Sequence, residues 1–101
     1  MCGICGLVSR EGIADRDEAV TREMSAALTH RGPDSDGFWS DGAAALAARR
    51  LSIIDLEHGD QPIANESGRL HVVQNGEIYN YRALRDRLVR QGHRLKTGSD
   101  T

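Results

Sequence analysis

Two cysteines at the start of the chain are the residues best suited to chemistry. Cys2 and Cys5 stand in MCGICG, a C-x₂-C spacing found in redox pairs and in half of a zinc site. Cys2 also directly follows Met1. Removal of the initiator methionine would leave Cys2 with a free α-amino group beside its own thiol. Nucleophile and base would then be one residue, as in enzymes whose N-terminal amine activates a neighbouring hydroxyl or thiol.

The two interpretations that need both thiols find little support elsewhere in the sequence. The chain has four histidines, which are His30, His58, His71 and His93. They form no H-x₃₋₅-H pair, and there is no second C-x₂-C, so a four-ligand zinc site would lack ligands. A redox pair should open a helix after a strand, whereas this motif begins the chain. We expect no metal site, and we assign Cys5 to packing as a small hydrophobe. An incidental Cys2 stays open as an alternative.

A nucleophilic thiol needs donors that stabilise an oxyanion, and QNGEIYN offers them. Asn75 can donate from its side-chain amide and Gly76 from its backbone N–H to the same oxygen. The alternative is a simple hairpin turn, which Asn-Gly most often signals. The residues that follow show a helical pattern instead of a returning strand, which favours the first interpretation.

Charged side chains could hold an amino-acid substrate by its two ends. Arg50 could bind an α-carboxylate as a bidentate pair. Glu77 or Asp100 could accept hydrogen bonds from an α-ammonium group. Adjacent residues on a strand face opposite sides, so only one of the pair Arg49 and Arg50 needs to point into such a site. A solvated surface charge is the alternative for each of them.

The composition excludes several classes of protein. The 101 residues correspond to one domain or part of one, with 39% hydrophobic and 28% charged residues. Thirteen basic and fifteen acidic side chains give a net charge of −2, and only four residues are aromatic, so nucleic acid is a poor partner. No run is apolar enough for a membrane span, and no signal peptide is evident. We therefore expect a cytoplasmic protein.

The first half of the chain predicts a strand, a helix and a hairpin. A strand is expected over Gly3–Ser9, and a turn over His30–Gly37. Asp15 and Glu18 suggest a capping box at the start of the helix. The apolar positions at helical spacing are Val20, Met24, Ala27 and Leu28. Asp41-Gly42 favours a two-residue turn between two antiparallel strands. The second of these strands is expected to run past Arg50 into Leu51, Ile53 and Ile54.

The second half predicts fewer elements. A polar, irregular stretch leads to a strand over Leu70–Gln74. A helix capped by Asn80 and stopped by Gly92 follows, and a short strand is expected over Arg94–Thr97. The helix residues expected to be buried are Tyr81, Leu84 and Leu88. This order of elements indicates an α+β protein with a mostly antiparallel sheet covered by helices.

Six motifs in this order carry a family resemblance. They are MCGICG, HRGPD, ARRLSIIDL, QPI, NGEIYNY and TGSD, and together they span almost the whole chain. The series resembles the N-terminal glutaminase domain of glutamine-hydrolysing asparagine synthetases. These are class II glutamine amidotransferases with the N-terminal-nucleophile hydrolase fold. The resemblance implies an αββα sandwich of antiparallel sheets, incomplete in this chain.

The resemblance also implies a reaction and roles for residues. The thiol of Cys2 would attack the side-chain amide of glutamine, releasing ammonia and then glutamate. Asn75 and Gly76 resemble the oxyanion hole of the family. Arg50 resembles the clamp on the α-carboxylate, and Glu77 and Asp100 resemble the partners of the α-ammonium group. The backbone around Leu51 and Ile53 would line the glutamine pocket.

Two departures from the family shape our expectations. Its glutaminase domain continues past Asp100-Thr101, so we interpret residues 1–101 as the N-terminal portion of that domain, marginal as a folded unit by itself. The C-terminal synthetase domain, which receives the ammonia and uses ATP and Mg²⁺ to amidate aspartate, is absent from this sequence. No cofactor is expected in the glutaminase portion. A homodimer is compatible with the full-length protein. Because Met1 would turn the Cys2 nitrogen into an amide, we expect the active protein to start at Cys2.

Three alternatives stay open. Another class II amidotransferase could share the mechanism and aminate a different acceptor, such as a peptide or a sugar. RLSIIDL and NGEIYN favour the asparagine synthetase branch, but the residues that choose the acceptor lie in the absent domain. A non-catalytic binding module is the second alternative, and a zinc or redox protein is the third.

Overall fold

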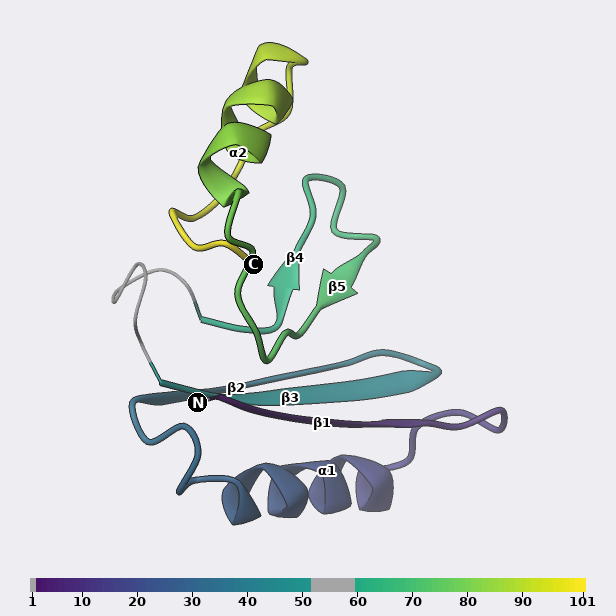
Figure 1. The fold of residues 1–101 in the computed structure, drawn as a ribbon. Coiled ribbons are helices and arrows are strands. Elements are labelled where there is room, and N and C mark those ends of the chain that lie inside the picture. The colour runs from purple at the N-terminus through teal and green to yellow at the C-terminus, as the bar shows by residue number, and fades with distance from the viewer. Residues whose placement is uncertain (1, 52–59) are drawn as a thin grey trace.

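A three-stranded antiparallel sheet forms the base of the molecule. The computed structural model describes residues 2–51 and 60–101 (Figure 1). The strands are β1 (Gly3–Val8), β2 (Ser35–Ser40) and β3 (Ala44–Arg50), in the order β1-β3-β2. The central strand β3 contributes the three buried apolar side chains found among the described residues, which are Ala45, Ala47 and Ala48. The core formed by residues 2–51 and 60–101 is therefore thin and made of small residues, so neighbouring elements can approach closely.

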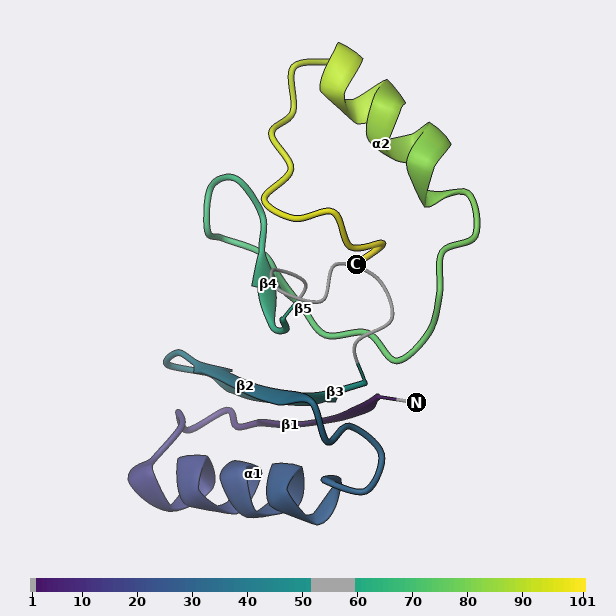
Figure 2. The same ribbon diagram turned by 90° about the vertical axis from the view of Figure 1, so that its left-hand side faces the viewer.

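Helix α1 (Asp15–Ala27) covers one face of this sheet, and residues 60–101 lie on the other side (Figures 1 and 2). Residues directly opposite in an antiparallel pair share a face. Cys5 therefore faces α1 together with its partners on the other two strands, Ala47 and Phe38. The Cys5 thiol donates to the Thr21 carbonyl at 3.7 Å, and the Arg22 guanidinium lies 3.8 Å from the centre of the Phe38 ring.

The buried face of α1 differs from the prediction. Thr21 and Ser25 are buried against the sheet, whereas Val20 and Met24 are 39% and 37% exposed. The prediction from apolar periodicity chose the wrong face of the helix. The sheet beneath the helix is lined by small side chains, so Thr and Ser can pack against it at close range. The capping prediction was also wrong. Ala14 precedes the helix, and its N–H donates to the Asp17 carboxylate at 2.9 Å.

The β2–β3 hairpin is confirmed, with corrected boundaries. β2 begins at Ser35, so the predicted turn over His30–Gly37 was three residues too long. The Asp41 N–H donates to the Ala44 carbonyl at 2.9 Å, and the Asp41 carboxylate accepts from the Ala43 N–H at 3.0 Å. The two-residue loop is therefore Gly42-Ala43, one position later than predicted, because the Asp41 side chain organises the turn that follows it. β3 ends at Arg50, and the predicted continuation through Ile53 and Ile54 lies outside the described residues.

A second, two-stranded sheet lies over the face of the first sheet that α1 leaves uncovered (Figure 2). It pairs β4 (Ile63–Ala64) with β5 (His71–Val72). The Trp39 and His71 rings stack with centroids 3.9 Å apart, which joins the two sheets. β4 was not predicted, because a two-residue strand gives no periodic signal. β5 is shorter than the strand predicted over Leu70–Gln74.

Helix α2 (Tyr81–Arg90) follows at the far end of the molecule. Gly92 ends it with φ of +92°, as predicted, and the His93 N–H returns to the Leu88 carbonyl at 3.0 Å. Asn80 occupies the N-cap position but makes no side-chain capping bond. The burial predicted for Tyr81, Leu84 and Leu88 was wrong, because no residue of α2 is buried. The strand predicted over Arg94–Thr97 is absent, and that segment is irregular.

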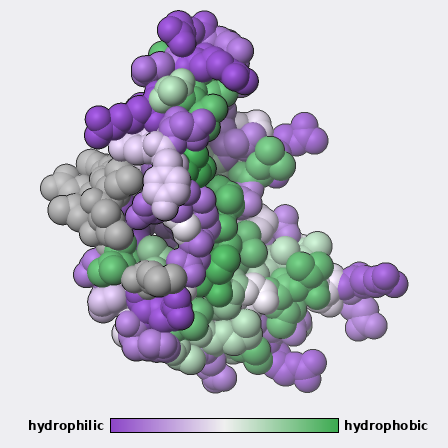
Figure 3. Space-filling view, in the orientation of Figure 1, coloured by the Kyte–Doolittle hydropathy of each residue, from purple (hydrophilic) through white to green (hydrophobic). Residues whose placement is uncertain are grey.

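The coarse prediction of fold class is confirmed: the described residues form an α+β structure with antiparallel sheets and two helices. Hydrophobic surface runs as a band between the helix α2 and the larger sheet, while hydrophilic residues dominate the periphery of the same face (Figure 3). Within residues 2–51 and 60–101, no helix has the length and apolar character needed to cross a bilayer.

Candidate active site

The residues predicted to do chemistry converge on one cavity of about 290 Å³. It opens between the C-terminal end of β3, the loop before α2 and the last residues of the chain. Seven of the eight predicted site residues line it: Cys2, Arg50, Leu51, Asn75, Gly76, Glu77 and Asp100. The eighth, Ile53, lies outside the described residues. The fold thus brings together, around a single cavity, residues that are up to about a hundred positions apart in the sequence.

Cys2 is held at the edge of the sheet, just before β1. Its thiol exchanges hydrogen bonds with the backbone of Leu51: the N–H donates to Sγ at 3.4 Å, and Sγ donates to the carbonyl at 3.8 Å. The Arg31 Nε donates to the Cys2 carbonyl at 3.4 Å. The pairing of Gly3 with Arg49 sets this register, so Cys2 lies beside the end of β3. Cys2 is therefore fixed beside the cavity.

Arg50 points into the cavity side of the sheet, while Arg49 points to the opposite side, as the alternation of strand residues predicted. The Arg49 Nε donates to the Gly32 carbonyl at 3.0 Å. Arg50 is only 6% exposed and pairs with the Asp60 carboxylate at 3.3 Å. Ser35 donates to the same Asp60 oxygen at 2.7 Å. A buried guanidinium with a fixed partner is suited to hold a carboxylate in a defined orientation.

Asn75, Gly76 and Glu77 lie in the loop between β5 and α2, and all three are exposed to solvent. Because helix α2 follows, the alternative of a hairpin turn at Asn-Gly was wrong. The backbone at Gly76 is open: a Cβ there would meet nothing nearer than a Gln74 side-chain nitrogen at 3.7 Å. A ligand can therefore approach this backbone closely.

Asp100 joins the end of the chain to this loop. Its carboxylate accepts a hydrogen bond from the Ile78 N–H at 2.7 Å. A carboxylate has two oxygens with several acceptor positions, so this bond leaves capacity for an ammonium group. Asp100 and Glu77 line the same cavity as Cys2.

Four further residues shape the site, and our sequence reasoning gave them no role. Arg31 contacts Cys2, and Asp60 contacts Arg50. Gln61 and Thr101 are hydrogen-bonded to each other beside the loop between β5 and α2. Arg31 and Gln61 stand in the HRGPD and QPI motifs, so the signal was present. Their partners lie 29 and 40 residues away, however, and nothing in the local pattern names them.

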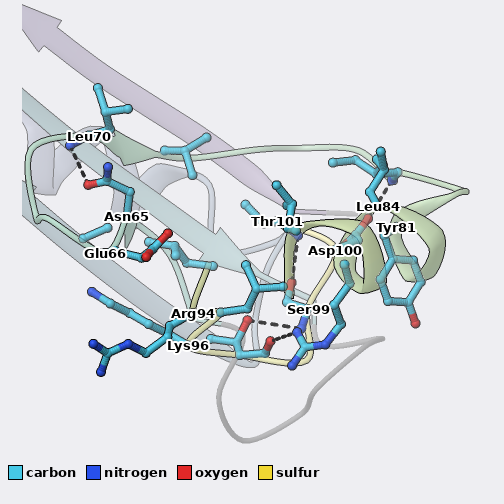
Figure 4. Close-up of a pocket in the computed structure, with 18 residues that line it drawn as sticks. Asn65, Glu66, Leu70, Tyr81, Leu84, Arg94, Lys96, Ser99, Asp100 and Thr101 are labelled. Carbon is cyan, nitrogen blue, oxygen red and sulfur yellow. Dashed lines mark hydrogen bonds between the residues drawn. The ribbon is translucent and has the colours of Figure 1, made fainter. Parts of the chain in front are cut away.

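A second cavity, of about 350 Å³, lies beside the first and beneath α2 (Figure 4). Its walls are mainly apolar, and Cys2 and Asn75 do not reach it. Ser99, Asp100 and Thr101 line both cavities and so form the wall between them. Among the described residues, no group of three or more His, Cys, Asp or Glu side chains is arranged to hold a metal ion.

Cys5 and Glu66, which both lie outside the site, have shifted pKa values. Burial beneath α1 raises the pKa of the Cys5 thiol. Cys5 is half-buried, so it packs against the helix as predicted without being enclosed. The pKa of Glu66 is lowered, chiefly by its 2.7 Å hydrogen bond with His93. The surroundings of the half-buried Cys5 thiol thus favour its protonated form.

A family model described as a glutamine amidotransferase domain matches residues 1–101. The chain belongs to this glutamine amidotransferase domain family. The cavity that contains Cys2 is therefore the candidate active site of an amidotransferase domain.

Curated relatives of this glutamine amidotransferase domain are named as asparagine synthetases. The glutamine-hydrolyzing asparagine synthetase 1 of Bacillus subtilis is 42% identical over 100% of this chain and 16% of its own length. The protein of the same name from Arabidopsis thaliana is 43% identical over 96% of this chain and 17% of its own. The glutamine-hydrolyzing asparagine synthetase 2 of Bacillus subtilis is 41% identical over 99% of this chain and 13% of its own. The chain thus spans about one sixth of the length of these relatives.

Proposed function

We propose that the chain is the glutamine-hydrolysing part of an asparagine synthetase-like amidotransferase, and that Cys2 is its nucleophile. The observation that carries this proposal is the cavity that brings Cys2, Asn75 and Gly76 together with one buried guanidinium and two carboxylates. A free amino acid has a carboxylate, an ammonium group and, in glutamine, an electrophilic side-chain amide. The cavity offers a complementary group for each of the three.

Glutamine binds by its two charged ends in this proposal. Its α-carboxylate pairs with Arg50, either joining Asp60 on the guanidinium or replacing it. Its α-ammonium group donates to Glu77 and Asp100. The side-chain amide then extends toward the thiol of Cys2, and Leu51 forms part of the wall.

The chemistry follows from these positions. With Met1 removed, the α-amine of Cys2 accepts the thiol proton, and Sγ attacks the amide carbon. The negative charge that develops on the amide oxygen is stabilised by the Asn75 side-chain N–H and the Gly76 backbone N–H. Collapse of this intermediate breaks the C–N bond. The α-ammonium group of Cys2 gives its proton to the departing amide nitrogen, which leaves as ammonia. Water then attacks the thioester, which releases glutamate and restores the thiol.

The wider assembly is also part of the proposal. We place the chain in the N-terminal portion of an αββα domain of the N-terminal-nucleophile hydrolase type. The matched relatives are several times longer than the chain, which leaves room for further domains in such a protein. Ammonia would pass to a C-terminal synthetase domain that amidates aspartate with ATP and Mg²⁺. The proposal assumes a cytoplasmic protein and is compatible with a homodimer. The glutaminase portion itself uses no cofactor in this scheme.

Ammonia release from glutamine by the full-length protein tests the proposal. We expect Cys2→Ala to abolish the release, while the matched Cys5→Ala variant keeps it within about threefold, because Cys5 only packs against α1. A Cys2→Ala variant that hydrolyses glutamine as fast as the parent would exclude Cys2 as the nucleophile. A parent that releases no ammonia would favour a non-catalytic binding module.

The acceptor requires a separate test. The motifs RLSIIDL and NGEIYN favour the asparagine synthetase branch over amidotransferases that modify a peptide or a sugar. We expect the full-length protein to form asparagine from aspartate, ATP and glutamine. Glutamine hydrolysis without asparagine formation would keep the glutaminase proposal and replace the acceptor.

A further inference from the structure

The side chain of Gln61 connects three segments around the candidate active site. Gln61 is 7% exposed and lines the same cavity as Cys2. Its Oε1 accepts from the Gln74 backbone N–H at 2.6 Å, and its Nε2 donates to the Thr101 hydroxyl at 3.1 Å. A backbone N–H can only donate, so the orientation of the amide is fixed. Both the oxygen and the nitrogen of this buried side-chain amide are therefore hydrogen-bonded.

The loop that carries Asn75 and Gly76 is anchored at both ends by hydrogen bonds, one from Gln61 and one from Asp100. Gln74, the residue before it, is bound by Gln61. Ile78, which lies two residues after Gly76, is bound by the Asp100 carboxylate.

Residues 97–101 close this arrangement into a ring. The Thr101 N–H donates to the Ser99 hydroxyl at 3.2 Å, and the Ser99 N–H donates to the Thr97 hydroxyl at 3.1 Å (Figure 4). Asp100 and Thr101 are adjacent and bind opposite ends of the loop, Asp100 directly and Thr101 through Gln61. The loop from Gln74 to Ile78 is thus one side of a closed hydrogen-bonded ring.

We propose that Gln61 is a positioning residue, which holds the oxyanion donors of Asn75 and Gly76 where the reaction needs them. This inference rests on the proposed glutamine hydrolysis. Donors of this kind are effective because they are fixed before charge develops, and a displacement of about 1 Å can cost about a hundredfold in rate. Asn75 and Gly76 are exposed, so surrounding side chains do not fix them by packing. Gln61 acts on their loop without itself touching the reacting atoms.

The first test compares kinetic constants of full-length variants. Gln61→Met keeps the size of the side chain and removes both hydrogen bonds. We expect kcat for glutamine hydrolysis to fall by about 10- to 100-fold, with KM changed by less than about threefold, because oxyanion contacts form in the transition state. Thr101→Val should give a smaller loss of the same kind, whereas Thr101→Ser keeps the hydroxyl and should restore the parent values. Gln91→Met, the same change at an exposed position, is the matched control.

The second test measures amide hydrogen exchange and needs no activity. We expect the Gln74 amide to exchange at least about tenfold faster in Gln61→Met than in the parent, with β3 amides unchanged and Gln91→Met identical to the parent. If Gln61→Met fails to fold, the Thr101→Val and Thr101→Ser pair decides by the same readouts. If the parent hydrolyses glutamine, a kcat of Gln61→Met equal to that of the parent overturns the inference. An exchange rate of the Gln74 amide that is the same in Gln61→Met and the parent overturns it as well. A parent without ammonia release defeats the proposed function instead, and the exchange rates then decide on the anchoring alone.

Discussion

Gly37 is the position at which one added methyl group should disturb the site most directly. It lies on β2, on the sheet face that meets the second sheet and the Gln61–Pro62 backbone. A Cβ at this position would lie 1.7 Å from the Gln61 carbonyl oxygen and 2.8 Å from its carbon. Contacts below 3.0 Å are not tolerated, so the two backbones must separate by about 3.0 − 1.7 = 1.3 Å. The Gly37 backbone is not left-handed, so the expected effect is steric.

The expected cost of Gly37→Ala follows from that displacement. Overpacking of this kind typically costs about 1–3 kcal/mol, which is about 5- to 150-fold faster local opening. Since Gln61 moves with its carbonyl, we also expect kcat for glutamine hydrolysis to fall by about a hundredfold. Gly42→Ala is the matched control, because nothing lies within 4 Å of a Cβ there. Its effect should stay within about 0.5 kcal/mol.

Two assays on the full-length protein check this prediction. Amide hydrogen exchange of β3 and of residues 61–64 reports local opening, and ammonia release reports kcat. If Gly37→Ala matches Gly42→Ala in both assays within about twofold, the close approach of β2 to Gln61 is wrong.

Three further predictions concern binding, pH and thiol reactivity. Arg50→Lys keeps the charge but loses the planar fork, so KM for glutamine should rise about 10-fold or more with kcat nearly unchanged, and an unchanged KM would exclude the carboxylate clamp. The His93 hydrogen bond lowers the pKa of Glu66 below its usual 4.5, so it stabilises the fold above that pH and the benefit disappears as pH falls through the lowered value. The hydrogen-exchange rate of the β4–β5 sheet in Glu66→Gln should therefore exceed that of the parent near about pH 6, and the difference should shrink as pH falls through the lowered pKa of Glu66. A rate difference that is absent at about pH 6 would contradict this linkage. Burial raises the pKa of Cys5, so iodoacetamide should label Cys2 first, and faster labelling of Cys5 would count against this assignment.

The sequence was sufficient for the elements with strong local signals. β1 and the β2–β3 hairpin follow from alternation and from Asp41-Gly42, although the Asp41 side chain shifts the loop by one residue. The end of α2 follows from Gly92, which adopts the positive φ that glycine tolerates. In each case the determining residue lies within a few positions of the feature that it sets.

The remaining features depend on contacts between distant segments. The buried face of α1 is set by the small alanines of β3, so Thr21 is buried where Val20 was expected. The two-residue strands β4 and β5 exist because they pair with each other, which no local pattern announces.

The candidate site shows the same division. Residue types and order pointed to Cys2, Arg50 and Asn75, and the structure gathers these residues around one cavity. The supporting contacts of Asp60 and Gln61 became visible only in three dimensions, because Asp60 bonds to Ser35 and Gln61 bonds to Thr101, which lie 25 and 40 residues away.

Peptide mapping of the full-length protein after reaction with an electrophilic glutamine analogue tests the central claim most directly. The analogue should be bound like glutamine and trap the nucleophile covalently. We predict a single label on the thiol of Cys2, in a peptide that begins with the free α-amino group of that residue. A label on another residue, or active protein that retains Met1, would contradict the proposed mechanism.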